Sequence, residues 1–152
     1  MARPTNTQFA LGVHLLTLLG GSPGAALSSD ILADSAGSNP VHVRRVLAHL
    51  RQAALVRSRP GPRGGWQLAA EPEAITLAEV WRAVQGDDHL LGLHGPNPNC
   101  PVGQRIQAEL VALDRRAAAA VEAELAQTTV AELVGSTDSA TLTVAGGATS
   151  RG

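Results

Sequence analysis

The pattern of apolar positions predicts a first helix, over about residues 5–19, that is apolar on two opposite faces. Phe9, Gly12, Val13 and Leu16 lie on one face, and Leu11, Leu15 and Leu18 lie on the other. A helix that is apolar nearly all round is normally buried on both sides. A surface beyond the next two helices must therefore cover the face formed by Leu11, Leu15 and Leu18.

Two further helices, joined by a tight turn, are predicted next. The first covers about Asp30–Ala36 and ends at Gly37. The second has Asn39 as its N-cap and Pro40 at its first helical position, and it reaches about Ala53. Its inner side is expected to carry Val43, Val46, Leu47 and Leu50, and its outer side Val41, Arg45, Ala48 and Gln52, flanked by His42, Arg44 and His49.

A β-hairpin with a basic tip follows. Leu55–Arg57 and Trp66–Leu68 are the predicted strands, and Ala26–Leu27 is a candidate for a third, very short strand. Prolines and glycines in the loop over 58–65 prevent strand continuation, and Gly64–Gly65 permits close approach of the backbone to a partner. This order of elements is typical of a winged helix-turn-helix, which is mostly α with a small β-hairpin wing.

The rest of the chain predicts helices. The capping box Thr76–Glu79 begins a helix over Leu77–Gln85. A loop covers 86–100, and Pro101 then opens a long helix that reaches about Gln127. Its apolar positions recur every three or four residues, close to a coiled-coil seam, at Val102, Ile106, Leu110, Leu113, Ala117 and Ala120. A second capping box, at Thr129 and Glu132, begins a short final helix.

Charge divides unevenly along the chain, although the net charge is only −1. Residues 1–70 hold seven arginines against two aspartates, a net +5, whereas residues 71–152 hold five arginines against eleven acidic residues, a net −6. The basic half predicts a surface for a polyanion. Every cation is an arginine, which can fork onto phosphate or guanine. An alanine-rich, GC-rich coding bias explains the lack of lysine equally well.

The predicted second helix of the pair and the hairpin tip together favour binding of duplex DNA. The start of that helix would carry arginine towards guanine edges in the major groove, and its backbone N–H groups would meet phosphate. The hairpin arginines would meet flanking phosphates or the minor groove. The predicted DNA-binding residues are Thr7, Ser38, Asn39, Val41, His42, Arg44, Arg45, Arg57, Arg59, Arg63, Gly64 and Gly65. A winged helix used only for contacts with other proteins is the alternative.

The chain resembles the Rrf2 family of bacterial transcription regulators over about residues 5–134. The matching segments are T-Q-F-A-L, N-P-V-H-V-R-R-V-L-A-H-L-R-Q-A-A-L-V, G-P-R-G-G-W-Q-L-A, I-T-L-A-E-V-W-R-A-V-Q-G and N-P-N-C-P-V-G-Q-R-I-Q. The resemblance implies a homodimer in which the long helix crosses over to the partner subunit and covers the open face of the first helix. The implied dimer interface comprises Leu11, Leu15, Leu18, Ile106, Leu110, Leu113 and Ala117.

The sequence thus predicts three parts. Residues 1–86 form a winged helix-turn-helix DNA-binding domain, 87–134 a sensor loop and dimerisation helix, and 135–152 a disordered tail. The function implied is a dimeric regulator, acting as a repressor, that binds a palindromic operator in double-stranded DNA. A small molecule held between the helix over 77–85, the loop and the long helix is an alternative signal. The operator, the regulated genes and the signal are not specified by the sequence.

Cysteine chemistry is limited to Cys100, so no intrachain disulfide can form. Rrf2 members that bind an iron–sulfur cluster place three cysteines before the long helix, and this chain departs from that pattern. We therefore expect no cofactor and no metal, although His89, His94 and Cys100 form a weak candidate set of ligands. Cys100 precedes Pro101, where the helix dipole favours an anionic sulfur. It is a candidate redox or electrophile sensor at the junction between the DNA-binding part and the long helix, with an inert structural cysteine as the alternative.

Enzymatic function is not expected. Phosphate-binding, dinucleotide-binding and zinc-protease motifs are absent, and a triad of Cys100, His94 and Asp88 would need one flexible loop to hold rigid geometry. The apolar run at the N-terminus is interrupted by polar residues and by Gly12, which argues against a cleaved signal peptide. No apolar run reaches transmembrane length, so a cytoplasmic protein without a membrane partner is predicted.

Overall fold

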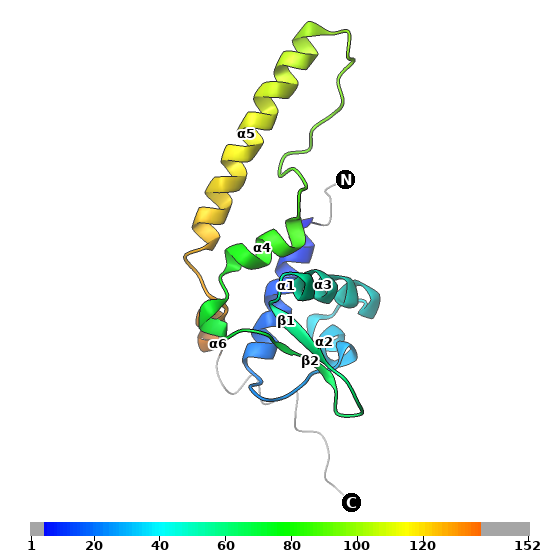
Figure 1. Ribbon diagram of the computed structural model, residues 1–152, viewed down its shortest axis with the longest axis vertical. Helices are drawn as coiled ribbons and strands as arrows, with labels where there is room; N and C mark the ends of the chain where they lie inside the picture. Colours follow the sequence, from blue (N-terminus) through cyan, green and yellow to red (C-terminus); the bar gives the residue numbers. More distant parts are fainter. Residues whose placement is uncertain (1–4, 138–152) are drawn as a thin grey trace, which may run out of the picture.

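The computed structural model describes residues 5–137, which form a body and a long arm (Figure 1). The arm consists of α5 and the loop that precedes it, and all other helices and both strands lie in the body. The elements are α1 (Thr5–Gly20), α2 (Ser29–Ala36), α3 (Pro40–Gln52), β1 (Val56–Arg59), β2 (Gly65–Leu68), the 3-10 helix η1 (Pro72–Ala74), α4 (Leu77–Gln85), α5 (Pro101–Leu125) and α6 (Val130–Ser136). This is a mostly α winged helix-turn-helix with a long C-terminal helix, as the sequence predicts.

The helix ends follow from caps that the sequence carries. Asn39 Oδ1 accepts the N–H of Val41 at 2.8 Å and begins α3. Thr76 and Glu79 form a reciprocal capping box at the start of α4, with each side chain accepting the other residue's backbone N–H. Gly37 ends α2 in the left-handed region, at φ 58°, which suits glycine. These predicted boundaries are confirmed.

The wing is a two-stranded antiparallel hairpin with one extra bridge. Arg57 pairs with Gln67, and Arg59 pairs with Gly65. Leu27 exchanges two backbone hydrogen bonds with Trp66, at 2.8 and 3.0 Å, so the predicted third strand is a bridge of one residue. This bridge ties the segment between α1 and α2 to the hairpin.

The second apolar face of α1 is covered inside the same subunit. Leu15 is fully buried and Leu11 is 8% exposed, and Leu18 packs against the same core. A side chain that is already buried in one subunit cannot contribute surface to a dimer. The prediction that the partner covers this face is therefore wrong, and Leu11 and Leu15 do not form part of a dimer interface.

Helices α4 and α6 pack on the face of α1 that carries Gly12 and Leu16, and α1 also contacts α2, α3 and β2. A Cβ on Gly12 of α1 would lie 3.2 Å from Val80 of α4, and one on Gly20 would lie 3.0 Å from Val134 of α6. The chain returns to the body after the arm, where the N–H of Val130 donates to the carbonyl of Ile75 at 2.9 Å. Helix α6 thus packs on α1 in the body, whereas the sequence grouped it with the sensor loop and the dimerisation helix.

The prediction of a disordered tail over 135–152 is wrong for its first two residues. Helix α6 continues through Ser136, so residues 135 and 136 are helical, and 138–152 lie outside the described residues. Within the described part of the chain, none of the helices combines the length and the apolar character needed to cross a membrane.

Candidate nucleic-acid interface

Helix α3 presents an outer face that is cationic and in part apolar. Arg44 and Arg45 are exposed, and Val41 is 59% exposed. The inner side chains, all fully buried, are Val43, Val46, Leu47 and Leu50, as the sequence predicts. Burial of this inner side fixes the rotation of the helix about its axis. The arginines must therefore point away from the body.

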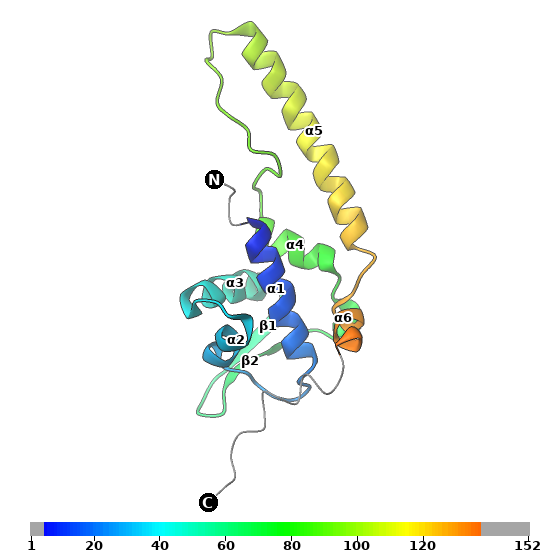
Figure 2. The ribbon, with the colours of Figure 1, turned by 180° about the vertical axis from the view of Figure 1, so that it is seen from behind.

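The wing adds further arginines at the same edge of the body. Arg57, Arg59 and Arg63 are all exposed. Figure 1 and Figure 2, which show opposite sides, both place α2, α3 and the hairpin tip at one edge, with the arm leaving the body elsewhere. The structure therefore brings the predicted arginines of the helix and of the hairpin to one edge. Thr7 is exposed in the first turns of α1.

Arg51 holds the wing against α3, a role that the sequence did not reveal. Its guanidinium carbon lies 5.9 Å from the centroid of the Trp66 ring on β2. A guanidinium over an aromatic face is attracted by the negative charge of that face. The contact forms only when the hairpin folds back on the last turn of α3, so spacing along the chain gives no signal for it.

Gly64 and Gly65 have a structural role in the wing. A Cβ on Gly64 would overlap the carbonyl oxygen of Arg59, and a Cβ on Gly65 would lie 2.5 Å from the carbonyl oxygen of Leu27. Gly65 also has φ 148°, which disfavours other residues. The glycine pair thus permits close approach between the wing and the protein's own backbone. Contact of Gly64 and Gly65 with DNA stays a prediction.

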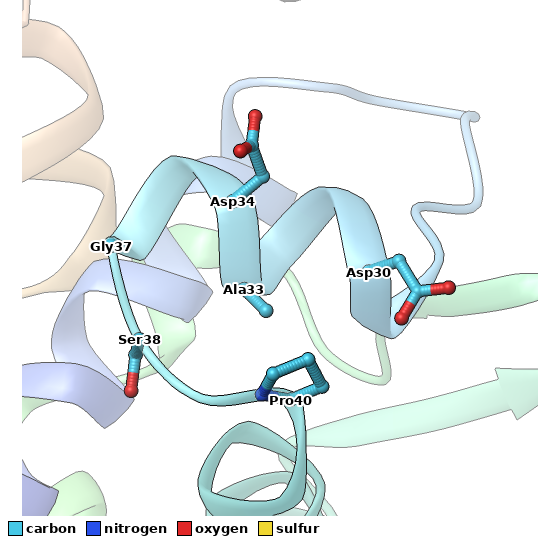
Figure 3. A pocket seen from close by; sticks show the side chains of 6 residues that line it. All are labelled: Asp30, Ala33, Asp34, Gly37, Ser38 and Pro40. Atoms are coloured by element: carbon cyan, nitrogen blue, oxygen red, sulfur yellow. The ribbon is translucent and has the colours of Figure 1, made fainter.

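A shallow hollow of about 360 Å³ lies between α2 and the start of α3. Figure 3 shows Asp30 and Asp34 projecting from α2, while the Ser38 hydroxyl points away from the Asp34 carboxylate. Two carboxylates repel phosphate, so this hollow is not suited to the DNA backbone. The phosphate contacts predicted for Ser38 and Asn39 would have to come from the outer side of the turn.

A buried carboxylate on α5 holds the loop of the arm in place. Asp114 is 5% exposed, and its two oxygens accept the Nδ1–H of His89 at 2.8 Å and the backbone N–H of Leu91 at 2.6 Å. The N–H of Leu91, followed by the His89 ring, holds the pKa of the Asp114 carboxyl below its usual range. The sequence suggested His89 as a metal ligand and gave no signal for this clamp, because its two parts are far apart along the chain.

Metal ligands are not brought together in the described residues. Over residues 5–137, no group of three or more His, Cys, Asp and Glu side chains is arranged to hold a metal ion. His89 binds Asp114 and does not meet His94 and Cys100 in a common site. The weak ligand set considered from the sequence is therefore not assembled.

We expect Asp114→Ala to release the loop from α5. The Leu91 amide loses its acceptor, so its hydrogen exchange at neutral pH should accelerate by roughly tenfold or more, as for a locally opened segment. Hydrogen exchange of the peptide covering 87–93 measures this, and Glu109→Ala, an exposed acidic position on the same helix, is the control. Equal exchange in wild type and Asp114→Ala would show that the clamp does not hold the loop.

The pH dependence of the clamp follows from the lowered pKa of Asp114. A carboxyl whose pKa is lowered on folding stabilises the folded arrangement at any pH above the pKa that it has in the unfolded chain. That contribution is lost as the pH falls through the folded-state pKa, which lies below the ordinary value of 3.8. The clamp should therefore persist throughout the neutral and mildly acidic range.

Cys100 caps α5 at the far end of the arm. Its Sγ accepts the N–H of Gly103 at 3.3 Å, and the residue is exposed. Figure 1 shows the loop running alongside α5 before the helix begins, so Cys100 lies away from the body. The prediction that it marks the junction between the DNA-binding part and the long helix is wrong. That junction in space is formed by α4 and the C-terminal half of α5, where Arg82 pairs with Glu122 at 3.2 Å.

An apolar stripe on α5 is left open within the described residues. Val102, Ile106 and Leu113 are 66%, 48% and 45% exposed. Leu110 and Ala117, which are half-buried, continue the same stripe. Four of these five residues were predicted from the sequence as dimer-interface positions, and Val102 was placed on the same seam. The stripe is an exposed apolar surface on a helix that packs on the body mainly through α4.

Comparison with known proteins relates the whole described chain to one family. Residues 5–136 match the Rrf2 family, which is described as an iron-dependent transcriptional regulator. The chain is 39% identical over 130 residues to YwnA of Bacillus subtilis, named as a helix-turn-helix-type transcriptional regulator. The match covers 85% of this chain and 96% of that protein.

Solved structures show the same fold over most of the chain. A protein described as DNA-binding is 36% identical, with a TM-score of 0.66, over 83% of this chain and 97% of its own. CymR, described as the global cysteine regulator of B. subtilis, is 25% identical, with a TM-score of 0.63, over 87% of this chain and 96% of its own.

Proposed function

Because the chain belongs to the Rrf2 family of DNA-binding transcriptional regulators, we propose that it binds a palindromic operator as a homodimer and represses the genes beside it. The observation that carries this proposal is the exposed arginine face of α3, with the wing arginines at the same edge of the body. The protein is a regulator and not an enzyme.

In the proposed complex α3 enters the major groove. Arg44 and Arg45 are the candidates for guanine, because a guanidinium can donate to both O6 and N7 of that base. The wing arginines, Arg57, Arg59 and Arg63, would lie on flanking phosphates or in the minor groove. The contact between Arg51 and Trp66 supports this arrangement, because it fixes the wing relative to α3.

The proposed dimer forms along the apolar stripe of α5. Two copies related by a two-fold axis would place the exposed Ile106 and Leu113 of one against the same stripe of the other. Arg105 and Glu109 flank a shallow hollow on this face, together with Leu110. Opposite charges at the rim suit self-pairing, since each arginine can meet the partner's glutamate.

The iron in the family description does not fit the residues of this chain. An iron–sulfur cluster is held by several soft ligands, and the chain has one cysteine. The sulfur of Cys100 caps α5. His89, at the other end of the loop, is bound to Asp114 and is not directed towards Cys100. We therefore propose that the chain holds no iron–sulfur cluster and that its regulation does not use iron.

A test of the DNA-binding surface uses the wing. Arg59→Ala and Arg63→Ala should weaken binding to all duplexes evenly and reduce the salt slope by about one for each phosphate that is no longer neutralised. Fluorescence anisotropy of a labelled duplex at several salt concentrations gives both quantities. Arg115→Ala, which removes the same charge from an exposed site on α5, is the control.

The outcomes of this test separate the two classes of function. A salt slope unchanged in both wing variants would show that the wing does not contact phosphate. If the wild type shows no salt-dependent affinity for duplex DNA at all, the operator-binding proposal is rejected, and a winged helix used for protein contacts is favoured.

For the signal, we propose thiol oxidation at Cys100, because the residue is exposed and its sulfur caps α5. The Sγ lies 3.3 Å from the Gly103 nitrogen, whose N–H it accepts at the start of α5. With no second cysteine in the chain, the stable product is a sulfenic acid, a mixed disulfide with a small thiol or a bridge between two subunits. Any of these enlarges the cap at the tip of the arm.

Oxidant should therefore weaken operator binding by wild type on the order of tenfold, about 1.4 kcal/mol, and leave Cys100→Ser unchanged. Anisotropy with and without mild hypochlorite, peroxide or oxidised thiol measures the effect. If oxidant changes the operator affinity of wild type and Cys100→Ser equally, Cys100 is a structural cap and not the sensor. The signal would then be a ligand, with the region between α4, the loop and α5 as the place to look.

A further inference from the structure

Val41 is the large apolar side chain that α3 leaves in solvent. It is 59% exposed in the first turn, whereas Val43 and Val46 on the other side are fully buried. It lies one helical turn before Arg45 and on the same outer face. A β-branched residue in an exposed helix position contributes little to helix stability. Its apolar surface gains nothing from the fold of the subunit and is free to contact a partner.

The other side chains at the start of α3 have a different chemistry. Asn39 would need both ends of its amide to recognise adenine, but its Oδ1 accepts the N–H of Val41. Helix α3 contains no Asp or Glu, so it offers no carboxylate acceptor for the amino group of cytosine. Besides Ser38 and His42, the start of α3 offers guanidinium for guanine and the aliphatic surface of Val41.

An aliphatic surface in the major groove can recognise one base feature directly, the C5-methyl group of thymine. We propose that Val41 contacts such a methyl group and makes the operator dependent on it. This inference rests on the proposed function, because it assumes that α3 enters the major groove. Val41 and Arg45 are four residues apart, about 6 Å along the helix, and bases on one strand are about 3.4 Å apart. The thymine should therefore lie within about two base steps of the guanine bound by Arg45.

The experiment replaces each thymine of the selected operator, one at a time, by uracil, which removes only the methyl group. Affinity of the full-length protein is then measured by anisotropy. We expect the affinity to depend on one thymine in each half-site. Its replacement by uracil should lower the operator affinity of the wild type about fourfold, which corresponds to the free energy of burying one methyl group. The Val41→Ala protein should bind the thymine and uracil operators equally well.

Two further variants make the result specific. Val41→Ile keeps an aliphatic side chain and should preserve the preference for thymine. Ile31→Ala removes another exposed aliphatic residue, 48% exposed on α2, and should also preserve it. Because Val41 is exposed, its substitution leaves the core of the body intact.

The possible outcomes have distinct meanings. If uracil lowers the operator affinity of wild type and of Val41→Ala by the same factor, another side chain contacts the methyl group. An operator with no position sensitive to uracil would also overturn the inference, although a selected motif would still support the proposed function. Failure to select any operator would reject the proposed function, and this inference with it.

Discussion

Leu113→Glu is expected to convert the proposed dimer into a monomer that has lost most of its affinity for the proposed operator. Leu113 is 45% exposed in the subunit, so the substitution leaves the core of the body untouched. In the dimer it would place a charge against the partner's apolar stripe, and burial of an unpaired charge is strongly unfavourable. A monomer holds one half-site instead of two, so operator affinity should fall roughly 100-fold or more.

Light scattering and anisotropy test this expectation on the same samples. Ala108→Glu is the matched control, because Ala108 is exposed on the same helix but on the side away from the apolar stripe. It adds the same charge and should stay dimeric with full affinity. A dimeric Leu113→Glu protein with unchanged DNA binding would place the interface elsewhere.

Arg45→Ala is expected to cost about 1–3 kcal/mol at the best operator, roughly 5- to 150-fold in affinity. Arg45 is exposed on the outer face of α3, in line with Val41. If its guanidinium reads guanine, its removal deletes two hydrogen bonds to one base. The variant should therefore also lose its preference for guanine at one position of each half-site.

The contrast with unspecific DNA distinguishes base reading from simple charge loss. On a duplex without the operator, Arg45→Ala should behave like the wing variants and lose only a small, salt-dependent part of its affinity. Anisotropy with the operator and with an unspecific duplex gives the ratio of the two affinities for each protein. An equal loss on both would show that Arg45 contacts phosphate and does not select a base.

Local features of the fold could be predicted because their causes lie close together in the sequence. The cap of α3 at Asn39 and the capping box at Thr76 join residues two or three positions apart. The rotation of α3 follows from the spacing of its apolar positions, which the buried Val46 and Leu50 confirm. Periodicity and capping were therefore enough to place the predicted arginines on exposed positions.

The parts that could not be predicted depend on residues far apart in the chain. The packing of α6 on α1 requires the chain to return to the body after the arm, where the N–H of Val130 donates to the carbonyl of Ile75. The clamp between Asp114 and Leu91 requires the loop to run along α5. That same path carries Cys100 to the tip of the arm. Sequence spacing contains no information on such a path, so the sequence placed Cys100 at a junction where it does not lie.

Selection of bound duplexes from a random pool by the full-length protein asks directly whether the chain is a dimeric, operator-binding regulator. We expect enrichment of an inverted repeat, with half-sites about one DNA turn or a multiple of it apart and a guanine in each. Binding of that sequence should fall with Arg45→Ala and with Leu113→Glu. A pool that yields no motif, or a motif without two-fold symmetry that both variants bind as well as the wild type, would rule out such a regulator.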